Sequence, residues 1–341
     1  MKPLETERLI LRKFEVSDFV DAHSYASSND NTVYMMWGPN SEDQTRAFIN
    51  YAINKADETP CTNYQYAVTI KDTGKFIGAV NLALYGDEAE IGWILHRDYW
   101  RHGFGTEMGA EMLRLGFQDL NLHRILAHCD AENIGSYRLM EKIGLRREGL
   151  FLEGRQAHKH SDKKYGDELS YAILRDEWET QQEIKYYNAL PFVFDDFIEV
   201  PELSDGVIYL VCTAKAPGNP EKKLVPEYKF LVCRRSEKIG GINLRVGYTD
   251  GLYFGGQIGY GIDEQHRGNG YAGRACQLLL PVAKAHGMKK LLITNDHAND
   301  ASRRVCEKLG ARFIRTARIA QWHDLYKEGR RFSNIFEWSV E

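Results

Sequence analysis

The sequence predicts an α/β protein made of two tandem lobes, each with a mixed, partly parallel central sheet flanked by helices. Three observations support this prediction. The length of 341 residues exceeds what one ordinary hydrophobic core fills. One pattern of strand, glycine turn, helix, strand and helix occurs twice. The copies also keep a nearly constant spacing, because Glu90 aligns with Gln257 at an offset of 167 residues and Asn133 with Asn299 at an offset of 166.

A change of composition marks the expected boundary between the lobes. Within residues 178–203, the polar stretch ETQQEIKYYN is followed by the aromatic and acidic stretch PFVFDDFIEVPE. We place the boundary near Lys185, which gives a first domain of residues 1–184 and a second domain of residues 185–341. The segment 215–226, rich in Lys, Pro and Gly, is interpreted as a surface loop rather than a site.

The expected strands and helices repeat in the same order. Each lobe supplies three strands, then a strand that runs into a glycine turn and a helix, then a further strand and a helix headed by Asn. Gly144 and Gly310 are expected to end those last helices in the left-handed conformation. The main strands are expected at 9–12, 66–70, 76–84 and 89–95 in the first lobe, and at 207–214, 228–233, 239–244 and 257–262 in the second.

Composition excludes several classes of function. Hydrophobic residues at 43% and charged residues at 27% are globular values, and a net charge of -4 favours neither nucleic acid nor an anionic membrane as partner. The N-terminal sequence MKPLETERLILRKFE lacks an apolar signal segment, and the longest apolar run, near 207–214, is too short to span a bilayer. We therefore expect a cytoplasmic protein without nucleic-acid or membrane partners. Its oligomeric state, monomer or homodimer, is left open.

The cysteines and histidines show no pattern of metal ligands. The six cysteines have no C-x-x-C spacing, which favours neither a zinc site nor a disulfide framework. His158 and His160 flank Lys159 without a third ligand nearby. We therefore expect no bound metal.

The two glycine turns, WRHGFG at 100–105 and RGNGYA at 267–272, are candidate anion sites. Each lies between a strand end and a helix start, where backbone N–H groups are unpaired and the helix dipole favours negative charge. Glycine permits the required dihedral angles and the close approach of phosphate oxygens. Two copies in the same context favour phosphate binding over simple chain reversal.

The order of these features resembles the GNAT acyltransferase superfamily, in which [Gln/Arg]-x-x-Gly-x-[Gly/Ala] joins a strand to a helix. Arg267, Gly270 and Ala272 fit this motif fully, whereas Trp100 replaces Gln or Arg in the first turn. The resemblance covers nearly the whole chain. The sequences TERLILRKFEVSDF and GDELSYAILRDEW and the segment around Trp37 are similar to the ribosomal-protein N-terminal acetyltransferase branch. The second lobe is similar to a predicted-acetyltransferase branch.

This resemblance implies that acetyl-CoA is the cosubstrate and lies between the strand before the turn and the next strand. It also implies that Asn133 and Asn299 contact the coenzyme, a role compatible with capping their helices. Ser136 and Ser302 match the residue that faces the thioester. The implied coenzyme-binding residues are Ile94, Leu95, Trp100, Arg101, His102, Gly103, Phe104, Gly105, Thr106 and Asn133 in the first lobe, and Gly261, Ile262, Arg267, Gly268, Asn269, Gly270, Tyr271, Ala272, Asn299 and Ser302 in the second.

Proton transfer points to the first lobe. Acetyl transfer needs a neutral amine and a way to handle the departing thiolate, so a positioned base and acid are expected. Glu90, ahead of the coenzyme contacts, is the candidate base; the alternative is a solvated carboxylate beside Asp87 and Glu88. Gln257 holds the matching place in the second lobe and cannot accept a proton.

The general acid is less clear from the sequence. Many family members carry a tyrosine four residues after the Asn-x-x-Ser position, but Met140 and Cys306 stand there in this chain. The resemblance implies that Ser136 serves the thiolate in the first lobe. Pro281 lies inside the second coenzyme helix, and together with Gln257 it makes the second lobe the expected degenerate one.

We therefore expect an N-acetyltransferase that uses acetyl-CoA to acetylate a primary amine, either a protein N-terminus or a small molecule. An α-amine with a pKa near 8 is roughly a tenth neutral at pH 7, and a lysine amine far less, so weak proton machinery favours the α-amine. One alternative is an enzyme that detoxifies an antibiotic or another small amine. The other is a CoA-binding sensor or structural protein in which one or both lobes are inactive.

Overall fold

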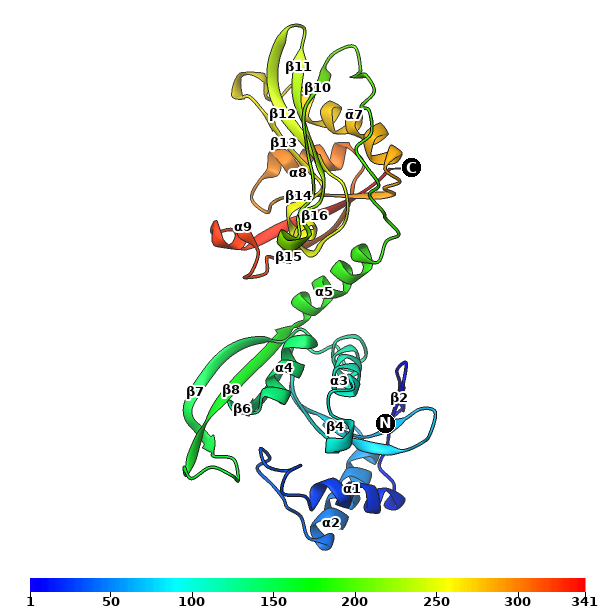
Figure 1. The fold of residues 1–341 in the computed structure, drawn as a ribbon, viewed down its shortest axis with the longest axis vertical. Coiled ribbons are helices and arrows are strands. Elements are labelled where there is room, and N and C mark those ends of the chain that lie inside the picture. Colours follow the sequence, from blue (N-terminus) through cyan, green and yellow to red (C-terminus); the bar gives the residue numbers. More distant parts are fainter. Residues whose placement is uncertain (341) are drawn as a thin grey trace. The chain divides into compact units, whose positions relative to one another are not determined.

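The structure, a computed structural model, describes residues 1–340 and separates into two compact units, Met1–Trp178 and Glu179–Glu341 (Figure 1). The separation falls within helix α5 (Arg175–Asn188). The boundary expected from the sequence, between 184 and 185, lies in the same helix. The contacts divide the chain earlier because Glu179 and Glu183 both bind Arg315 of the second unit, at 2.7 and 2.9 Å.

The first lobe is built on one eight-stranded sheet with the order β1-β2-β3-β4-β5-β6-β8-β7. Its neighbours are antiparallel except β5 and β6, which are parallel. The strands are β1 (Leu4–Glu5), β2 (Leu9–Arg12), β3 (Asn63–Ile70), β4 (Phe76–Tyr85), β5 (Glu88–Leu95), β6 (Arg124–Asp130), β7 (Arg146–Gln156) and β8 (Tyr165–Leu174).

Two pairs of helices form separate clusters on this sheet. Helix α3 (Phe104–Arg114) buries Met108 and Met112 in the main core, to which helix α4 (Ile134–Lys142) contributes Met140. Helices α1 (Phe19–Ala26) and α2 (Glu42–Asp57) pack in a second cluster. The sequence starts α2 through a capping box, in which the Ser41 hydroxyl accepts from Gln44 N–H and the Gln44 side chain accepts from Ser41 N–H.

The second lobe repeats the order of elements along the chain, but its described strands form two sheets whose pairs are all antiparallel. The partly parallel central sheet expected in each lobe is therefore present in the first lobe and not in the second. One sheet of the second lobe has the order β13-β12-β11-β10-β9 and the other β14-β16-β15. Its strands are β9 (Leu203–Ser204), β10 (Tyr209–Ala216), β11 (Glu227–Arg234), β12 (Glu237–Arg245), β13 (Ile258–Ile262), β14 (Lys290–Asp296), β15 (Arg312–Arg318) and β16 (Phe332–Ser339). Its helices are α6 (Asp250–Gly255), α7 (Tyr271–Ala285), α8 (Asp300–Lys308) and α9 (Asp324–Lys327).

The main strands expected from the sequence are present, with ends that differ by at most three residues. Gly144 and Gly310 follow α4 and α8 with φ of 97° and 73°, so both supply the expected left-handed stop. Pro281 does not interrupt α7, which is assigned as one helix through Ala285. The aromatic stretch after α5 is more than a connection, because Phe192, Phe194 and other apolar residues of this stretch pack on the second core.

Among the helices of the described part of the chain, none combines the length and apolar character needed to cross a membrane.

Candidate acyl-transfer sites at the two strand separations

In the first lobe the two parallel strands separate at a defined point. β5 and β6 pair only from Glu88↔Arg124 to Glu90↔Leu126, although β5 continues to Leu95 and β6 to Asp130. Beyond Glu90, β5 keeps β4 as its neighbour and β6 keeps β8. The sheet therefore opens a wedge between β5 and β6 with strand edges on both sides.

The second lobe opens at the same place in its repeat. The backbone N–H of Gln257 donates to the Leu292 carbonyl at 2.8 Å, and beyond it β13 and β14 each form the edge of a separate sheet. The Gln257 side chain closes the wedge: its oxygen accepts from Leu292 N–H, and its nitrogen donates to the Gly247 carbonyl at 3.0 Å. Gln257 is fully buried and is bonded at both ends of its amide. We call this residue the clasp of the second lobe; Glu90 holds the same position in the first lobe.

The carbonyl groups at the ends of β5 and β13 point in different directions, and this separates the expected coenzyme contacts into two kinds. A Cβ at Gly78 of β4 would meet the Ile94 carbonyl at 2.2 Å, and one at Gly240 of β12 would meet the Gly261 carbonyl at 2.3 Å. The carbonyls of Ile94 and Gly261 therefore point to the neighbouring strand. Those of Leu95 and Ile262 lie on the open side of their strands, as their bonds to side chains of the glycine turns show.

Trp100 and Arg267, which begin the two turns, make the same bond with different chemistry. Trp100 Nε1 donates to the Leu95 carbonyl at 2.9 Å, and Arg267 Nε donates to the Ile262 carbonyl at 3.0 Å. A single side-chain N–H in this position is sufficient to hold the turn against the strand end. The departure of Trp100 from the family motif therefore preserves the geometry of the turn.

Both glycine turns place left-handed residues immediately before the helix. In the first turn Arg101 has φ of 63° and Gly103 has φ of 84°; in the second, Gly268 has φ of 83° and Gly270 has φ of 76°. Gly103 and Gly270 are the N-caps of α3 and α7. The first N–H groups of these helices, those of Phe104, Gly105 and Thr106 or of Tyr271, Ala272 and the next residue, have no acceptor within the helix. Both turns therefore present donors to an anion.

The space above the turns fits a phosphate group. A Cβ at Gly268 or Gly270 would meet nothing within 4 Å, so the second turn, which includes the exposed Asn269, is open. At Gly103 a Cβ would meet Arg8 Nη2 at 3.2 Å. The Arg8 guanidinium binds the His102 carbonyl at 3.1 Å and pairs with Glu107 at 2.7 Å, so its charge is matched by a carboxylate beside the first turn. Arg8 lies between β1 and β2, far from the turn in the sequence, and no pattern in the sequence predicts its contact there.

Asn133 and Asn299 cap α4 and α8 in the same way. Asn133 Oδ1 accepts from Ser136 N–H at 3.1 Å, and Asn299 Oδ1 accepts from Ser302 N–H at 3.0 Å. The capping role is therefore present in both lobes. The Ser136 hydroxyl lies within hydrogen-bonding reach of the Cys129 thiol, whose burial raises its pKa to about 11.

Glu90 has a partner that the sequence did not reveal. Its carboxylate lies 3.3 Å from Nδ1 of His128, on β6, and the two side chains are 42% and 32% exposed. This hydrogen bond raises the pKa of His128 above its ordinary value, and Glu168 of β8 adds to the effect while Arg124 opposes it. The pair lies where the wedge begins, so a carboxylate and an imidazole with a raised pKa together border the opening. In the register of the repeat, Gln257 and Thr294 take their places in the second lobe.

A loop and a hairpin are joined beside the first wedge. Asn31, before α2, donates to the Leu95 carbonyl at 3.0 Å and accepts from Arg97 N–H at 2.8 Å. Lys159, in the loop of the long β7–β8 hairpin (Figure 1), donates to the carbonyls of Thr32 and Trp37 at 2.9 and 2.6 Å. The segment 31–37 is therefore held at the strand end and at the hairpin. Burial lowers the pKa of Lys159.

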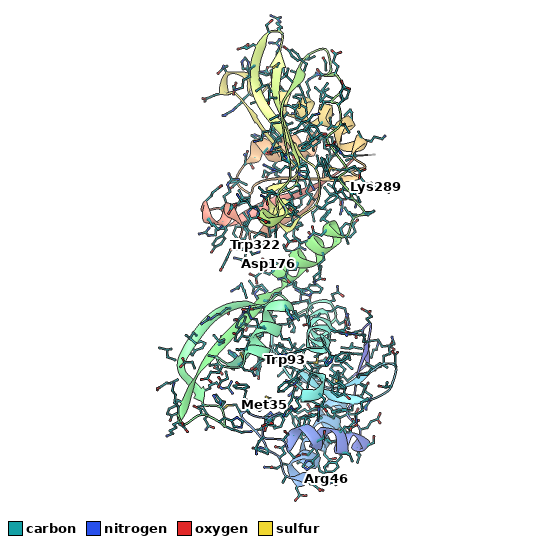
Figure 2. All side chains as sticks on the ribbon, in the orientation of Figure 1. Met35, Arg46, Trp93, Asp176, Lys289 and Trp322 are labelled. Carbon is teal, nitrogen blue, oxygen red and sulfur yellow. The ribbon has the colours of Figure 1, made fainter. Side chains whose placement is uncertain are left out.

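The second lobe contains a cavity of about 860 Å³ at its wedge. Its wall includes Tyr260 of β13, Thr294 of β14 and Ser302 of α8, and extends to the aromatic residues Phe254 and Trp322. Trp322 is 55% exposed and lies at the margin of the lobe (Figure 2). The segment 215–226, expected to be only a surface loop, also contributes to this wall through Lys222 and its neighbours.

Within residues 1–340, no cluster of three or more His, Cys, Asp or Glu side chains has an arrangement that could hold a metal ion.

Comparisons with known proteins give the family. The model of the acetyltransferase (GNAT) domain matches residues 8–146 and 209–312. The chain is 36% identical over 177 residues to the uncharacterised N-acetyltransferase YnaD of Bacillus subtilis, which covers 51% of this chain and 98% of that protein. It is 34% identical over 161 residues to the uncharacterised N-acetyltransferase p20 of Bacillus licheniformis, with 46% of this chain and 89% of that protein covered.

Among solved structures, a GNAT-family acetyltransferase from Bacillus anthracis shares 35% identity, with 51% of this chain and 99% of that chain covered and a TM-score of 0.45. The family match confirms the resemblance inferred from the two glycine turns, and its two separate regions agree with two tandem lobes. The chain therefore belongs to the GNAT family of acetyltransferases, as an acyltransferase that carries the family's domain pattern twice.

Proposed function

We propose that the first lobe transfers the acetyl group of acetyl-CoA to a primary amine, with Glu90 and His128 as its proton-accepting pair. The observation that carries the proposal is the 3.3 Å contact between Glu90 and His128 at the point where β5 and β6 separate. A carboxylate and an imidazole at the mouth of the wedge supply the base that attack by an amine requires.

The residues of the first turn fit the phosphates of the coenzyme. Backbone N–H groups from Arg101 to Thr106 and the positive end of α3 favour an anion at this place. Leu95, on the open side of β5, and Asn133, at the cap of α4, border the wedge beyond the turn. Bound there, acetyl-CoA would supply an activated acetyl group as a thioester.

The proton leaves the amine through the Glu90–His128 pair. An amine must be neutral to attack, and one with a pKa near 8 is already roughly a tenth neutral at pH 7. The imidazole of His128 accepts the proton, and the Glu90 carboxylate stabilises the imidazolium that results. Ser136, at the start of α4, is the proposed donor toward the departing thiolate.

The acceptor is a primary amine of a protein N-terminus or of a small molecule. Segment 31–37 is bonded to the end of β5 through Asn31 and to the β7–β8 hairpin through Lys159. We propose that this segment forms one side of the acceptor site. Trp37 is 38% exposed on this side, which gives an apolar contact for the body of the acceptor. An α-amine suits the pair better than a lysine amine, because less proton removal is needed before attack.

The test measures release of CoA thiol by the full chain from acetyl-CoA. The acceptors are a peptide with a free N-terminus, the same peptide with its N-terminus blocked, and a cationic aminoglycoside. Turnover with the free but not the blocked peptide supports an α-amine, and turnover with the aminoglycoside alone supports a detoxifying enzyme. Binding of acetyl-CoA without turnover of any amine supports a sensor or structural role and contradicts the proposal.

A further inference from the structure

We propose that the second lobe is a second acyl-transfer site, in which Tyr260 acts through Ser302 to stabilise the thiolate of the departing coenzyme. The inference goes beyond the proposed function, which concerns the first lobe. Two hydroxyl groups are in contact in the wall of the cavity at the second wedge.

The contact joins two elements on opposite sides of the wedge. Tyr260 lies on β13 and Ser302 on the first turn of α8, and their oxygen atoms are 2.8 Å apart. Both residues belong to the wall of the 860 Å³ cavity. Ser302 is already fixed by its backbone, because its N–H donates to the Asn299 cap at 3.0 Å. The two hydroxyls are therefore held in place before any ligand arrives.

The position of Tyr260 differs from that of the tyrosine expected from the family pattern. Cys306 stands at the expected place on α8 and is fully buried, with a pKa raised to about 11 by burial. The phenol comes instead from the strand, at the position that Trp93 holds in the first lobe (Figure 2). Trp93 has an indole N–H but no hydroxyl group, so the first lobe has no pair of hydroxyls at this position.

The second wedge has the other parts of a coenzyme site. The open turn at Gly268 and Gly270 presents helix N–H groups to an anion without obstruction. The edge of β13 runs from that turn to the cavity, since β13 pairs only with β12 among the described strands. A coenzyme bound by its phosphates at the turn would thus carry its sulfur along β13 toward Tyr260 and Ser302.

The electron and proton balance favours a hydrogen-bonding role for Tyr260. Attack by a neutral nitrogen forms the N–C bond, the C–S bond breaks, and its electron pair goes to sulfur. The Ser302 hydroxyl donates to that sulfur while its oxygen accepts from the Tyr260 hydroxyl. The proton lost by the nitrogen goes to water, and the thiolate later takes a proton from water.

Burial supports this division of roles. It raises the pKa of Tyr260 strongly, and the titratable groups that face the phenol, Cys276 of α7 and Cys306 of α8, add to the shift. The wall of the cavity also carries charged side chains, namely Lys222, Lys223, Glu227, Arg245, Asp296, Asp324 and Arg330. A phenol that keeps its proton at pH 7 is a stable donor and a poor acid. It stabilises negative charge on sulfur without transferring its proton.

The test uses CoA, whose thiol is the leaving group, bound to the full chain. Iodoacetamide alkylates the thiolate, and mass spectrometry of S-alkylated CoA at a series of pH values gives the apparent pKa of the bound thiol. CoA bound at the second lobe is identified as the part of the alkylation signal that is lost in Gly270→Asp and kept in the isosteric Gly270→Asn. Asp and Asn tolerate the left-handed conformation better than other residues, so the two variants differ in charge rather than in strain.

In Tyr260→Phe and in Ser302→Ala we expect the apparent pKa of this thiol to rise by about one unit, a tenfold lower thiolate fraction. The matched control is Tyr248→Phe, because Tyr248 donates to the Lys290 carbonyl outside the cavity wall and should leave the thiol unchanged. An unchanged thiol pKa in Tyr260→Phe with CoA still bound would overturn the proposal. So would the absence of any component that depends on Gly270. Neither result bears on turnover by the first lobe, which is measured through Glu90.

Discussion

The substitution Glu90→Gln removes a carboxylate while keeping the shape of its side chain, and it tests the first-lobe chemistry directly. A positioned general base contributes about 10²–10⁴-fold to a rate, and Glu90 orients and supports the imidazole of His128 that accepts the proton, so we expect kcat/KM for the amine to fall by about 100-fold. The same change removes the group that does most to raise the pKa of His128. An ion pair this exposed is worth about 0.5–1 kcal/mol, which corresponds to a fall of about half a unit in the His128 pKa.

The direction of the pH dependence follows from that shift. The pKa of His128 is raised, so the imidazole is protonated and unable to accept a proton below that value. In the wild-type protein kcat/KM should therefore rise with pH through a midpoint above about 6.5, and in Glu90→Gln that midpoint should move down. The pair stabilises the folded lobe most below the ordinary histidine pKa, and this stabilisation is lost as the pH rises through the folded value.

The assay follows CoA thiol release at saturating acetyl-CoA, from about pH 5.5 to about pH 9, a range that brackets the histidine titration. Glu88→Gln is the matched control, because Glu88 lies two residues earlier on β5 and pairs with Arg124. We expect it to retain the wild-type profile. If Glu90→Gln and His128→Gln both keep wild-type kcat/KM at every pH, neither residue handles the proton and the assignment is refuted.

Three further predictions concern the clasp, the tied loop and the first turn. Gln257→Ala leaves the Leu292 N–H and the Gly247 carbonyl without their partners and should lower the free energy of unfolding by about 2–5 kcal/mol. Glu90→Ala should lower it by less than about 1 kcal/mol. Equal losses in denaturant titrations would contradict the structural role of Gln257. Lys159→Met should raise the KM for the amine by about tenfold, the value of one hydrogen bond to a charged group, and should leave the affinity for acetyl-CoA unchanged. The matched variant Lys163→Met, at an exposed position, should change neither quantity. Calorimetric titration should show weaker acetyl-CoA binding in Gly103→Asp than in Gly103→Asn, because the shapes match and only the charge differs; equal affinities would contradict a phosphate at this turn.

Local chemistry made much of the fold predictable from the sequence. The two glycine turns, the Asn caps of α4 and α8 and the left-handed stops at Gly144 and Gly310 depend on residues within a few positions of each other. Their physics is the same wherever the segment lies in the molecule. The repeat then predicted the order of strands and helices along the chain, but not that the strands of the second lobe form two sheets.

The parts of the site that the sequence did not reveal come from distant segments. Arg8, Asn31 and Lys159 bond to residues that are 64 to 122 positions away along the chain. Neither periodicity nor spacing carries information about such contacts. His128 is different, because strand alternation places it on the same face as Glu90 once the parallel register of β5 and β6 is known. Knowledge of that register would have predicted the pair.

Gln257 shows why a repeat position can keep its geometry and change its role. In the sequence, Gln257 stands where the first lobe has the Glu90 carboxylate. This difference suggests that the second lobe is degenerate. In the structure the Gln257 amide supplies both a donor and an acceptor to the point where β13 and β14 part. A carboxylate cannot donate there without a proton, and burying its charge would be costly. At this position the second lobe therefore has a structural amide where the first lobe has the proposed base.

In the two proposals, the lobes differ in the groups they offer to the amine and to the leaving thiolate. The first has a carboxylate and an imidazole toward the amine, and a serine whose neighbour is the Cys129 thiol. The second has Gln257 and Thr294 in place of that pair, and a serine held by the Tyr260 phenol on the sulfur side. A site that helps the leaving group but not the amine works best on nitrogen that is already neutral at pH 7. We therefore expect the two proposed sites to prefer acceptors of different basicity, because Gln257 and Thr294 of the second wedge replace Glu90 and His128 of the first.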